Sequence, residues 1–463
     1  MAIRRVGLIL ALLSLGCSNP PPAGKDAGIN TVGQDAAALA LYEITTLDPN
    51  ATGDYAISLS VRGNKIAVAY WVDADASIAA PVNRDAGGET VTESAHELRY
   101  VEKSGTGAPS APEVVATTYN VYGGSMALDS TGKPYVAFLG PPSNAGTKWL
   151  EACTVVATHS APGAAWTQTV AATVFDQVVG LWASIAFDSN DKMYVGYRNI
   201  HYGQFPIQDY AHSNLEMAEG SPSALTAQNC LVAADRGKCP FFGGDNPDGH
   251  GAFLSIAMVG TAPNQEPAFA WSTMAAGALD TAHNVWFAQR KNGSWPATVL
   301  PISVPSGVVG GVSTGTGMYG TSYGGPQLAW DKDAGFIIAF DAHNVGQLFL
   351  KESPDGVDWS KAADPVFGSG SGGWYPSVAF TPDGFPAVAF YICDPSRTGV
   401  TTCPTAVDEI RLTWRVDDNW QQHQETVDPE GGHYMRLAYL SDGRAVIAYR
   451  DVNHRSIKVA VRK

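Results

Sequence analysis

Seven segments of the chain share one pattern of apolar and polar positions. Each starts with a small or polar residue and an apolar strand, passes through a turn rich in Gly, Asp and Asn, and ends in a second strand that closes on an aromatic residue. Alternation with a period of two residues, broken by turn residues, predicts antiparallel hairpins. The segments are SLSVRGNKIAVAY (58–70), SMALDSTGKPYVAF (125–138), SIAFDSNDKMYVGY (184–197), SIAMVGTAPNQEPAFAW (255–271), QLAWDKDAGFIIAF (327–340), SVAFTPDGFPAVAF (377–390) and RLAYLSDGRAVIAY (436–449).

Each hairpin is followed by two more predicted strands. A connection of variable length leads to a third apolar strand, such as NVWFAQR (284–290), and a turn then leads to a fourth, as in KNGSWPATVL (291–300). Four antiparallel strands per unit, repeated around a ring, describe the blades of a β-propeller. The sequence therefore predicts an all-β fold, a seven-bladed β-propeller with four antiparallel strands per blade.

The two ends of the chain predict how the ring closes. The last unit stops after its third strand, at Lys463, and a spare strand, LALYEITTL (39–47), precedes the first unit. If the spare strand completes the last blade, no long sheet edge is left exposed. Two stacked β-sandwiches are the alternative, but they would not account for the spare strand. We therefore assign residues 39–463 to the propeller.

Two kinds of motif carry a resemblance to known propellers. AYRDVNHRSIKVAV (448–461) and AFDAHNVGQLFLKE (339–352) resemble a bacterial family whose repeats run strand, Tyr-x-Asp, a short turn containing Asn, and Leu-x-x-Ala. SPDGVDW (353–359) resembles the Asp-box turn of sialidase-type propellers, one residue shorter than the usual spacing. Such motifs mark blade structure and imply a fold rather than a chemistry.

The N-terminus predicts export and anchoring. The chain starts with two basic residues, Arg4 and Arg5, followed by an apolar run from Val6 to Leu15. Because this run is too short to span a bilayer, residues 1–16 are predicted to be a signal peptide. Leu-Ser-Leu-Gly-Cys, ending at Cys17, resembles the lipobox of bacterial lipoproteins, which implies a lipidated Cys17 followed by a flexible tether over residues 17–38. An ordinary signal peptide with a chance Cys is the alternative. The resemblance implies a lipid anchor in the bacterial cell envelope, at the outer membrane. We expect the protein to be a monomer.

The net charge of the chain makes some classes of binding partner unfavourable. At −15, the chain is too acidic to favour nucleic acid or an anionic membrane surface, so contact with the membrane is expected only through the lipid. The same acidity would simply keep an exported protein soluble.

Five cysteines remain besides Cys17. Cys230 and Cys239 flank one short loop and Cys393 and Cys403 another, which predicts two disulfides in an exported protein. A zinc site is the alternative, but the four thiols lack CxxC spacing. Cys153 alternates with apolar neighbours and is expected to be a buried free thiol.

The predicted topology gathers loops on one face, around the central channel. The connections that follow the second strands of the fifth and seventh blades are short. They are expected to form a low side of the channel mouth, where a groove is accessible. Aromatic rings beside charged and imidazole groups can bind an anionic or carbohydrate-like ligand. Alternatively, the aromatics wedge adjacent blades apart and the Asp and Asn residues shape turns. The candidate ligand-binding residues are Asp341, His343, Trp374, His433, Tyr434, Arg450 and His454.

The leading function is a binding or scaffold module for a protein or glycan ligand on the channel face. The alternative is a carbohydrate-active enzyme, for which no catalytic residue is assigned. A sialidase-like hydrolase would draw on Arg198, Arg436 and Arg450 with Tyr434, Asp341 and Asp451, and a polysaccharide lyase on His343, His433 and Tyr323.

No cofactor is expected, because no Gly-rich phosphate loop leads from a strand into a helix. The one weak metal candidate is calcium at Asp245 and Asp248 of DNPDGHG (245–251). Their spacing is not that of an EF-hand, and an Asx turn is the simpler interpretation.

Overall fold

The structure is a computed structural model, and it describes most of the chain from residue 41 to residue 463. The positions outside the description are 1–40, 76, 78–82, 85–89, 92–94, 106, 119–120, 122, 141–152, 175–176, 201–212, 229, 231–235, 242–249, 274–284, 297–298, 300, 303–324, 343–345, 369–371, 393–408, 418 and 421. The predicted signal peptide, Cys17, the tether, the Cys393–Cys403 pair, His343, Tyr323 and the calcium candidates Asp245 and Asp248 therefore lie outside the described residues. Within the described part, no helix is long and apolar enough to cross a membrane.

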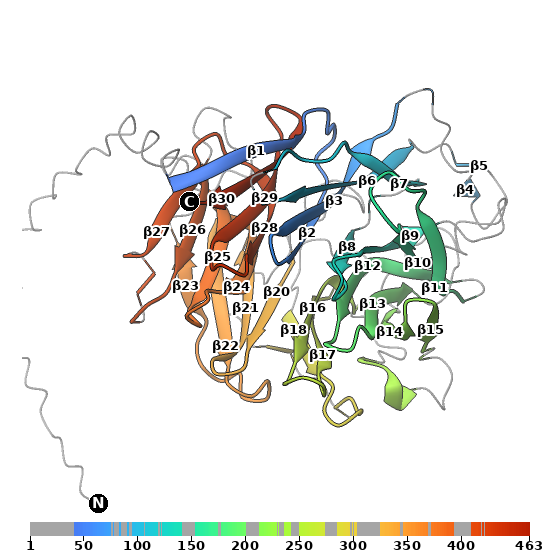
Figure 1. The fold of residues 1–463 in the computed structure, drawn as a ribbon. Coiled ribbons are helices and arrows are strands. Elements are labelled where there is room, and N and C mark those ends of the chain that lie inside the picture. The colour runs from blue at the N-terminus through green and yellow to red at the C-terminus, as the bar shows by residue number, and fades with distance from the viewer. Residues whose placement is uncertain are drawn as a thin grey trace, which may run out of the picture.

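Seven antiparallel sheets of four strands form a ring, and this confirms the predicted all-β propeller (Figure 1). From the innermost strand outward, blade 1 contains β2 (Ile57–Arg62), β3 (Lys65–Asp73), β6 (His96–Ser104) and β7 (Glu113–Thr118). Blade 2 contains β8 (Gly124–Leu128), β9 (Pro134–Gly140), β10 (Cys153–Thr158) and β11 (Thr167–Ala172). Blade 3 contains β12 (Val178–Phe187), β13 (Met193–Ile200), β14 (Ser213–Ser221) and β15 (Ala224–Ala227).

The remaining blades follow the same order. Blade 4 contains β16 (Ala252–Val259), β17 (Glu266–Ser272), β18 (Val285–Gln289) and β19 (Pro301–Ile302). Blade 5 contains β20 (Gln327–Asp331), β21 (Gly335–Ala342), β22 (Gln347–Ser353) and β23 (Asp364–Phe367). Blade 6 contains β24 (Gly372–Phe380), β25 (Pro386–Ile392), β26 (Glu409–Trp414) and β27 (Gln424–Asp428). A small hairpin of β4 (Asn83–Arg84) and β5 (Thr90–Val91) lies in an insertion of blade 1.

Blade 7 joins the two ends of the chain. It consists of β28 (His433–Tyr439), β29 (Ala445–Asp451), β30 (Ser456–Arg462) and, as its outermost strand, β1 (Tyr42–Asp48). β1 pairs with β30 in antiparallel register from Tyr42↔Arg462 to Asp48↔Ile457. Figure 1 shows blue β1 lying against red β30. The spare strand therefore closes the ring as predicted.

Burial explains why the second strands read as continuous apolar runs. Both faces of each sheet pack against a neighbouring blade, and in β9, β25 and β29 every residue is buried. The outermost strands have a solvent-facing side, so β11 begins with four exposed residues. The aspartates of the repeats organise the first hairpin turn: Asp129 Oδ1 accepts hydrogen bonds from the backbone N–H groups of Thr131 and Lys133 at 2.9 and 3.0 Å.

Candidate functional site

The central channel is lined by one equivalent residue from each innermost strand. It encloses a cavity of about 300 Å³. Six of the seven equivalent residues are neutral and polar, whereas the seventh is an arginine. In blade order they are Ser58, Ser125, Ser184, Ser255, Gln327, Ser377 and Arg436.

Four of these serines join adjacent blades. Each hydroxyl oxygen accepts a hydrogen bond from a backbone N–H of the next innermost strand, so the seams between blades are tied at the channel wall. The donors and distances are Met126 to Ser58 at 2.9 Å, Ile185 to Ser125 at 2.7 Å, Leu328 to Ser255 at 3.1 Å and Leu437 to Ser377 at 2.9 Å.

An aromatic residue stands two positions before the channel residue in four blades. Trp182, Phe253, Tyr375 and Tyr434 all adopt a left-handed backbone with φ of 51–55° and are buried. Their rings pair between neighbouring blades, Trp182 with Phe253 at 5.0 Å and Tyr375 with Tyr434 at 4.7 Å. At the equivalent position of blade 5, a Cβ on Gly325 would lie 2.1 Å from the Phe253 Cβ, so only glycine fits beside that ring. These aromatics wedge the blades apart at the channel mouth.

One imidazole–carboxylate pair remains open to solvent at this mouth. His433 Nδ1 lies 3.0 Å from Asp54 Oδ2, and their side chains are 22% and 39% exposed. The His433 ring stacks on Tyr375 at 4.8 Å and meets the edge of Tyr391 at 5.1 Å. Because the rings fix the imidazole, the pair has a defined orientation over an aromatic floor.

Blade 1 extends this polar surface. The Tyr55 hydroxyl donates to Asp73 Oδ1 at 2.6 Å, and His96 Nδ1 lies 3.7 Å from the same oxygen. Burial, helped by Asp73, raises the pKa of Tyr55 well above its usual value, so the phenol stays a hydrogen-bond donor. Burial also lowers the pKa of His96. We define the mouth cluster as Asp54, Tyr55, Asp73, His96, Tyr375, Tyr391 and His433.

Of the mouth cluster, the sequence predicts only His433 as a ligand-binding candidate, and Asp54, Asp73 and His96 were missed. The two aspartates stand in the entry segment GDY (53–55) and the exit segment WVDAD (71–75), so the sequence contained a signal for them. His96 opens β6, where no pattern distinguishes it from an ordinary strand residue.

Arg450, a predicted ligand-binding residue, supports the mouth cluster from below. Its side chain is fully buried. Nε donates to the Tyr55 carbonyl at 3.0 Å, and Nη1 donates to the carbonyls of Ala51 and Gly53 at 3.0 and 2.9 Å. Further bonds reach the carbonyls of Thr52 and Trp71. Arg450 therefore ties blade 7 to the loop of blade 1 that presents Asp54 and Tyr55.

Arg198 occupies the same repeat position in blade 3 and is also buried. Its Nε donates to Ser213 Oγ at 2.9 Å, and its guanidinium lies 5.4 Å from the Trp182 ring centroid. Arg198 and Arg450 are thus engaged by protein groups on different blades. The structure does not turn them toward one substrate carboxylate, as the sialidase-like alternative requires.

The other predicted ligand-binding residues that the structure describes lie in the channel wall, in the sheet interior or in a turn. Trp374 and Tyr434 pack in the wall, and the Asp341 side chain is completely buried. His454 is 58% exposed in the turn after β29, where its Nδ1 lies 2.7 Å from Asp451 Oδ2. Of the described candidates, only His433 belongs to the exposed mouth cluster. A ligand-binding role for any of them stays a prediction.

Ligand atoms of Glu430, Asp451 and His454 lie within 4.8 Å of one another. However, Lys458 Nζ lies 2.6 Å from Asp451 Oδ2 and 3.5 Å from Glu430 Oε2. The ammonium group therefore already supplies the positive charge that a cation would bring.

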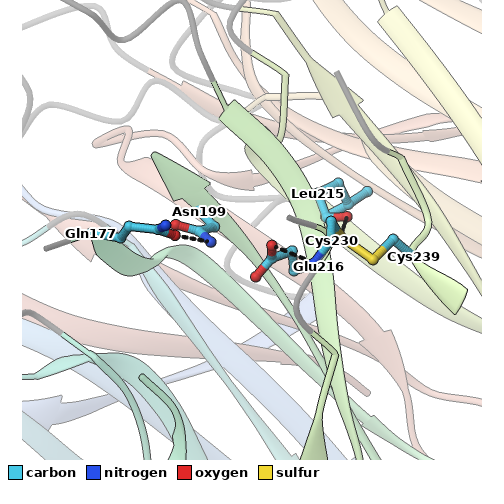
Figure 2. The surroundings of a disulfide bond; sticks show 6 residues. All are labelled: Gln177, Asn199, Leu215, Glu216, Cys230 and Cys239. Carbon is cyan, nitrogen blue, oxygen red and sulfur yellow. Dashed lines mark hydrogen bonds between the residues drawn. A yellow bond between two sulfur atoms is a disulfide. The ribbon is translucent and has the colours of Figure 1, made fainter. Parts of the chain in front are cut away.

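The structure contains the predicted disulfide between Cys230 and Cys239, and Cys153 is a buried free thiol as expected. Glu216, completely buried in β14, lies beside this disulfide and accepts a hydrogen bond at Oε1 from the Cys230 backbone N–H at 3.1 Å. Figure 2 shows its carboxyl between the disulfide and the Asn199–Gln177 pair. Burial raises the pKa of Glu216 to about 7.

Because of the raised pKa of Glu216, we expect the free energy of unfolding to depend on pH. Because Glu216 holds its proton more tightly in the folded state, its contribution is fully present only below about pH 4.5 and is lost as the pH rises through about 7. Glu216→Gln, which resembles the neutral acid, should match the native protein at about pH 4 and be more stable at pH 8 by about 3 kcal/mol. Urea unfolding at both pH values measures this. Equal stability of the two proteins at pH 8 would contradict it, and Asp383→Asn, at an exposed turn position, is the control.

Comparisons with known proteins identify no family. No family model and no curated protein matches the chain. Among solved structures, the NanB sialidase from Streptococcus pneumoniae is 11% identical, covering 90% of this chain and 69% of that one, with a TM-score of 0.43. A protein of unknown function from Dyadobacter fermentans is 10% identical, covering 90% and 98%, with a TM-score of 0.44. A fungal alcohol oxidase is 11% identical, covering 91% and 75%, with a TM-score of 0.46. At these values the likenesses carry no argument about function.

Proposed function

We propose that the chain is an exported binding protein whose mouth cluster binds a carbohydrate or another ligand rich in hydroxyl groups. The observation that supports this most is the exposed His433–Asp54 pair, fixed over the rings of Tyr375 and Tyr391. Preformed polar groups beside aromatic rings are typical of sites that orient a small ligand.

The charges of the mouth cluster favour a neutral ligand at this position. Asp54 and Asp73 are 39% and 49% exposed, and both carboxylates accept hydrogen bonds, which sugar hydroxyls can donate. A carboxylate or phosphate of the ligand would instead meet two negative charges. We therefore favour neutral glycans over acidic ones.

A binding role fits the geometry better than catalysis does. Arg450 holds the Asp54–Tyr55 loop through its backbone, so the site is rigid before a ligand arrives, and a preorganised site gains affinity. Arg198 and Arg450 are already engaged, and no specific observation favours the hydrolase or the lyase.

We also propose that the protein is located in the cell envelope. The apolar run at Val6–Leu15 and the lipobox-like Cys17 support export and lipid anchoring, with residues 17–38 as the tether. Fractionation of cells into membrane and soluble exported material tests this part, and recovery of the intact protein in the cytoplasm would contradict it.

Binding of the protein to an array of neutral oligosaccharides tests the site. We expect Asp54→Ala/His433→Ala to weaken binding by roughly tenfold or more, the effect of losing one or two hydrogen bonds to a ligand. The matched control is Asp442→Ala/Arg444→Ala, another exposed acid–base pair on the turn between β28 and β29. Equal binding by both double variants would place the ligand elsewhere.

A further inference from the structure

Arg436 is the exception in the sevenfold pattern of the channel. Five blades place a serine at this position and blade 5 places Gln327, whereas blade 7 places a guanidinium in the cavity. Among the described residues that line the cavity, Arg436 is the only one that carries a charge. The six other blades form the same structure with a neutral residue at this position, so the fold does not require a cation here.

The guanidinium lacks an acidic partner within the described part of the chain. Within the described residues, its Nη1 donates a hydrogen bond to the carbonyl of the adjacent Met435, at 3.0 Å. Burial lowers the pKa of Arg436 to about 10, which still leaves it charged at neutral pH. Arg436 keeps some solvent exposure, so a cation here without a counter-charge costs less than a fully buried one, and a bound anion would offset the cost that remains.

The serines around it are arranged to donate. Where a serine oxygen accepts the backbone N–H of the next blade, as in Ser58, Ser125 and Ser377, its own O–H hydrogen is left for a partner in the channel. The cavity wall therefore offers hydroxyl donors together with the guanidinium.

The seam between blades 7 and 1 lacks the serine acceptor that four of the other six seams use. In the repeat, the residue after the channel position donates its N–H to the preceding blade, as Leu437 does to Ser377. The equivalent residue of blade 1 is Leu59, and its counterpart across the seam is Arg436, a side chain that can only donate. An anion between them would accept from both sides.

We propose that the central channel binds a small oxyanion, a free carboxylate, sulfate or phosphate ion, between Arg436 and the serine hydroxyls. A cavity of about 300 Å³ holds such an ion with some water but not a polymer. The site uses none of the residues of the mouth cluster, so it does not depend on the proposed glycan function.

Thermal unfolding of the full chain tests the site. Acetate, sulfate and phosphate are each added at constant ionic strength against chloride, and direct binding is measured by calorimetry. We expect at least one of the three to raise the melting temperature and to bind. Arg436→Ser and Arg436→Gln copy residues that other blades carry at this position, so both should fold, and each should weaken binding by roughly tenfold or more.

Two comparisons separate the site from other effects. Sulfate stabilises many proteins without binding to them, and this general part should persist unchanged in both Arg436 variants. Arg444→Ser removes an exposed arginine of the same blade and should keep the full response. Polygalacturonate distinguishes a free ion from an acidic polymer, and we expect no binding. An equal response to all three anions in native protein and Arg436→Ser, absence of binding by the native protein, or binding of only the polymer would overturn the proposal.

Discussion

A chain that begins at Ala51, and so lacks β1, is expected to lose most of its cooperative stability. β1 covers the edge of β30 along its length, and Tyr42 and Leu47 are buried there. Burial of two such side chains contributes roughly 3–6 kcal/mol, which is comparable with the whole stability of many domains.

β1 also holds neighbouring blades together. Asp48 accepts a hydrogen bond from the buried Tyr70 hydroxyl at 2.6 Å and another from Arg99 at 3.2 Å, both in blade 1. Tyr42 donates to Glu425 of blade 6 at 2.7 Å. Removing β1 would leave these groups without partners and expose a sheet edge that can pair with other molecules.

Thermal unfolding and size-exclusion chromatography measure the effect. A chain beginning at Leu41 keeps β1 and is the matched control, which should unfold like the longer protein. A chain that starts at Ala51 retains the carbonyl groups that accept hydrogen bonds from Arg450. The truncation therefore tests the pairing of β1 with β30 separately from the hydrogen bonds of Arg450. If the chains beginning at Leu41 and Ala51 melted at the same temperature, β1 would not be what closes the ring.

Arg450→Met is expected to destabilise the propeller by about 4 kcal/mol, because several buried acceptors lose their donor at once. Of the five carbonyls that Arg450 reaches, four lie in the connection from β1 to β2 and one in β3 of blade 1, so the seam between blades 7 and 1 would loosen. Arg450→Lys keeps the charge but lacks the guanidinium fork, so we expect it to recover only part of the loss.

Urea unfolding measures this change, with Arg444→Met as the exposed control, for which the expected change is within about 0.5 kcal/mol. The substitution should also weaken ligand binding at the mouth cluster, since Arg450 positions the loop that carries Asp54. A native-like unfolding midpoint for Arg450→Met would show that the seam holds without this residue.

The fold could be predicted from the sequence because its determinants are local and repeated. Alternating strands, turn residues and their sevenfold recurrence predict the blades, and the unpaired strand at 39–47 predicts the closure that β1 and β30 make. The Cys230–Cys239 disulfide was predictable for the same reason, since it closes a short loop.

The candidate site was only partly predictable. Arg450, Trp374 and Tyr434 are residue types that often bind ligands, yet all three are buried in the seam and wall. Whether a side chain faces solvent or an adjacent blade depends on how two sheets pack, and the pattern along one strand does not contain that information.

The tertiary structure alone decided which residues meet. Asp54 and His433 are 379 positions apart and become partners only because the ring closes between blades 7 and 1. The sequence shows an arginine where other repeats have serine, but the structure places Arg436 in a channel shared by all seven blades. The sequence by itself therefore determined the blades, their number and their closure, whereas the packing of blades around a common axis decided what the mouth and the channel present to a ligand.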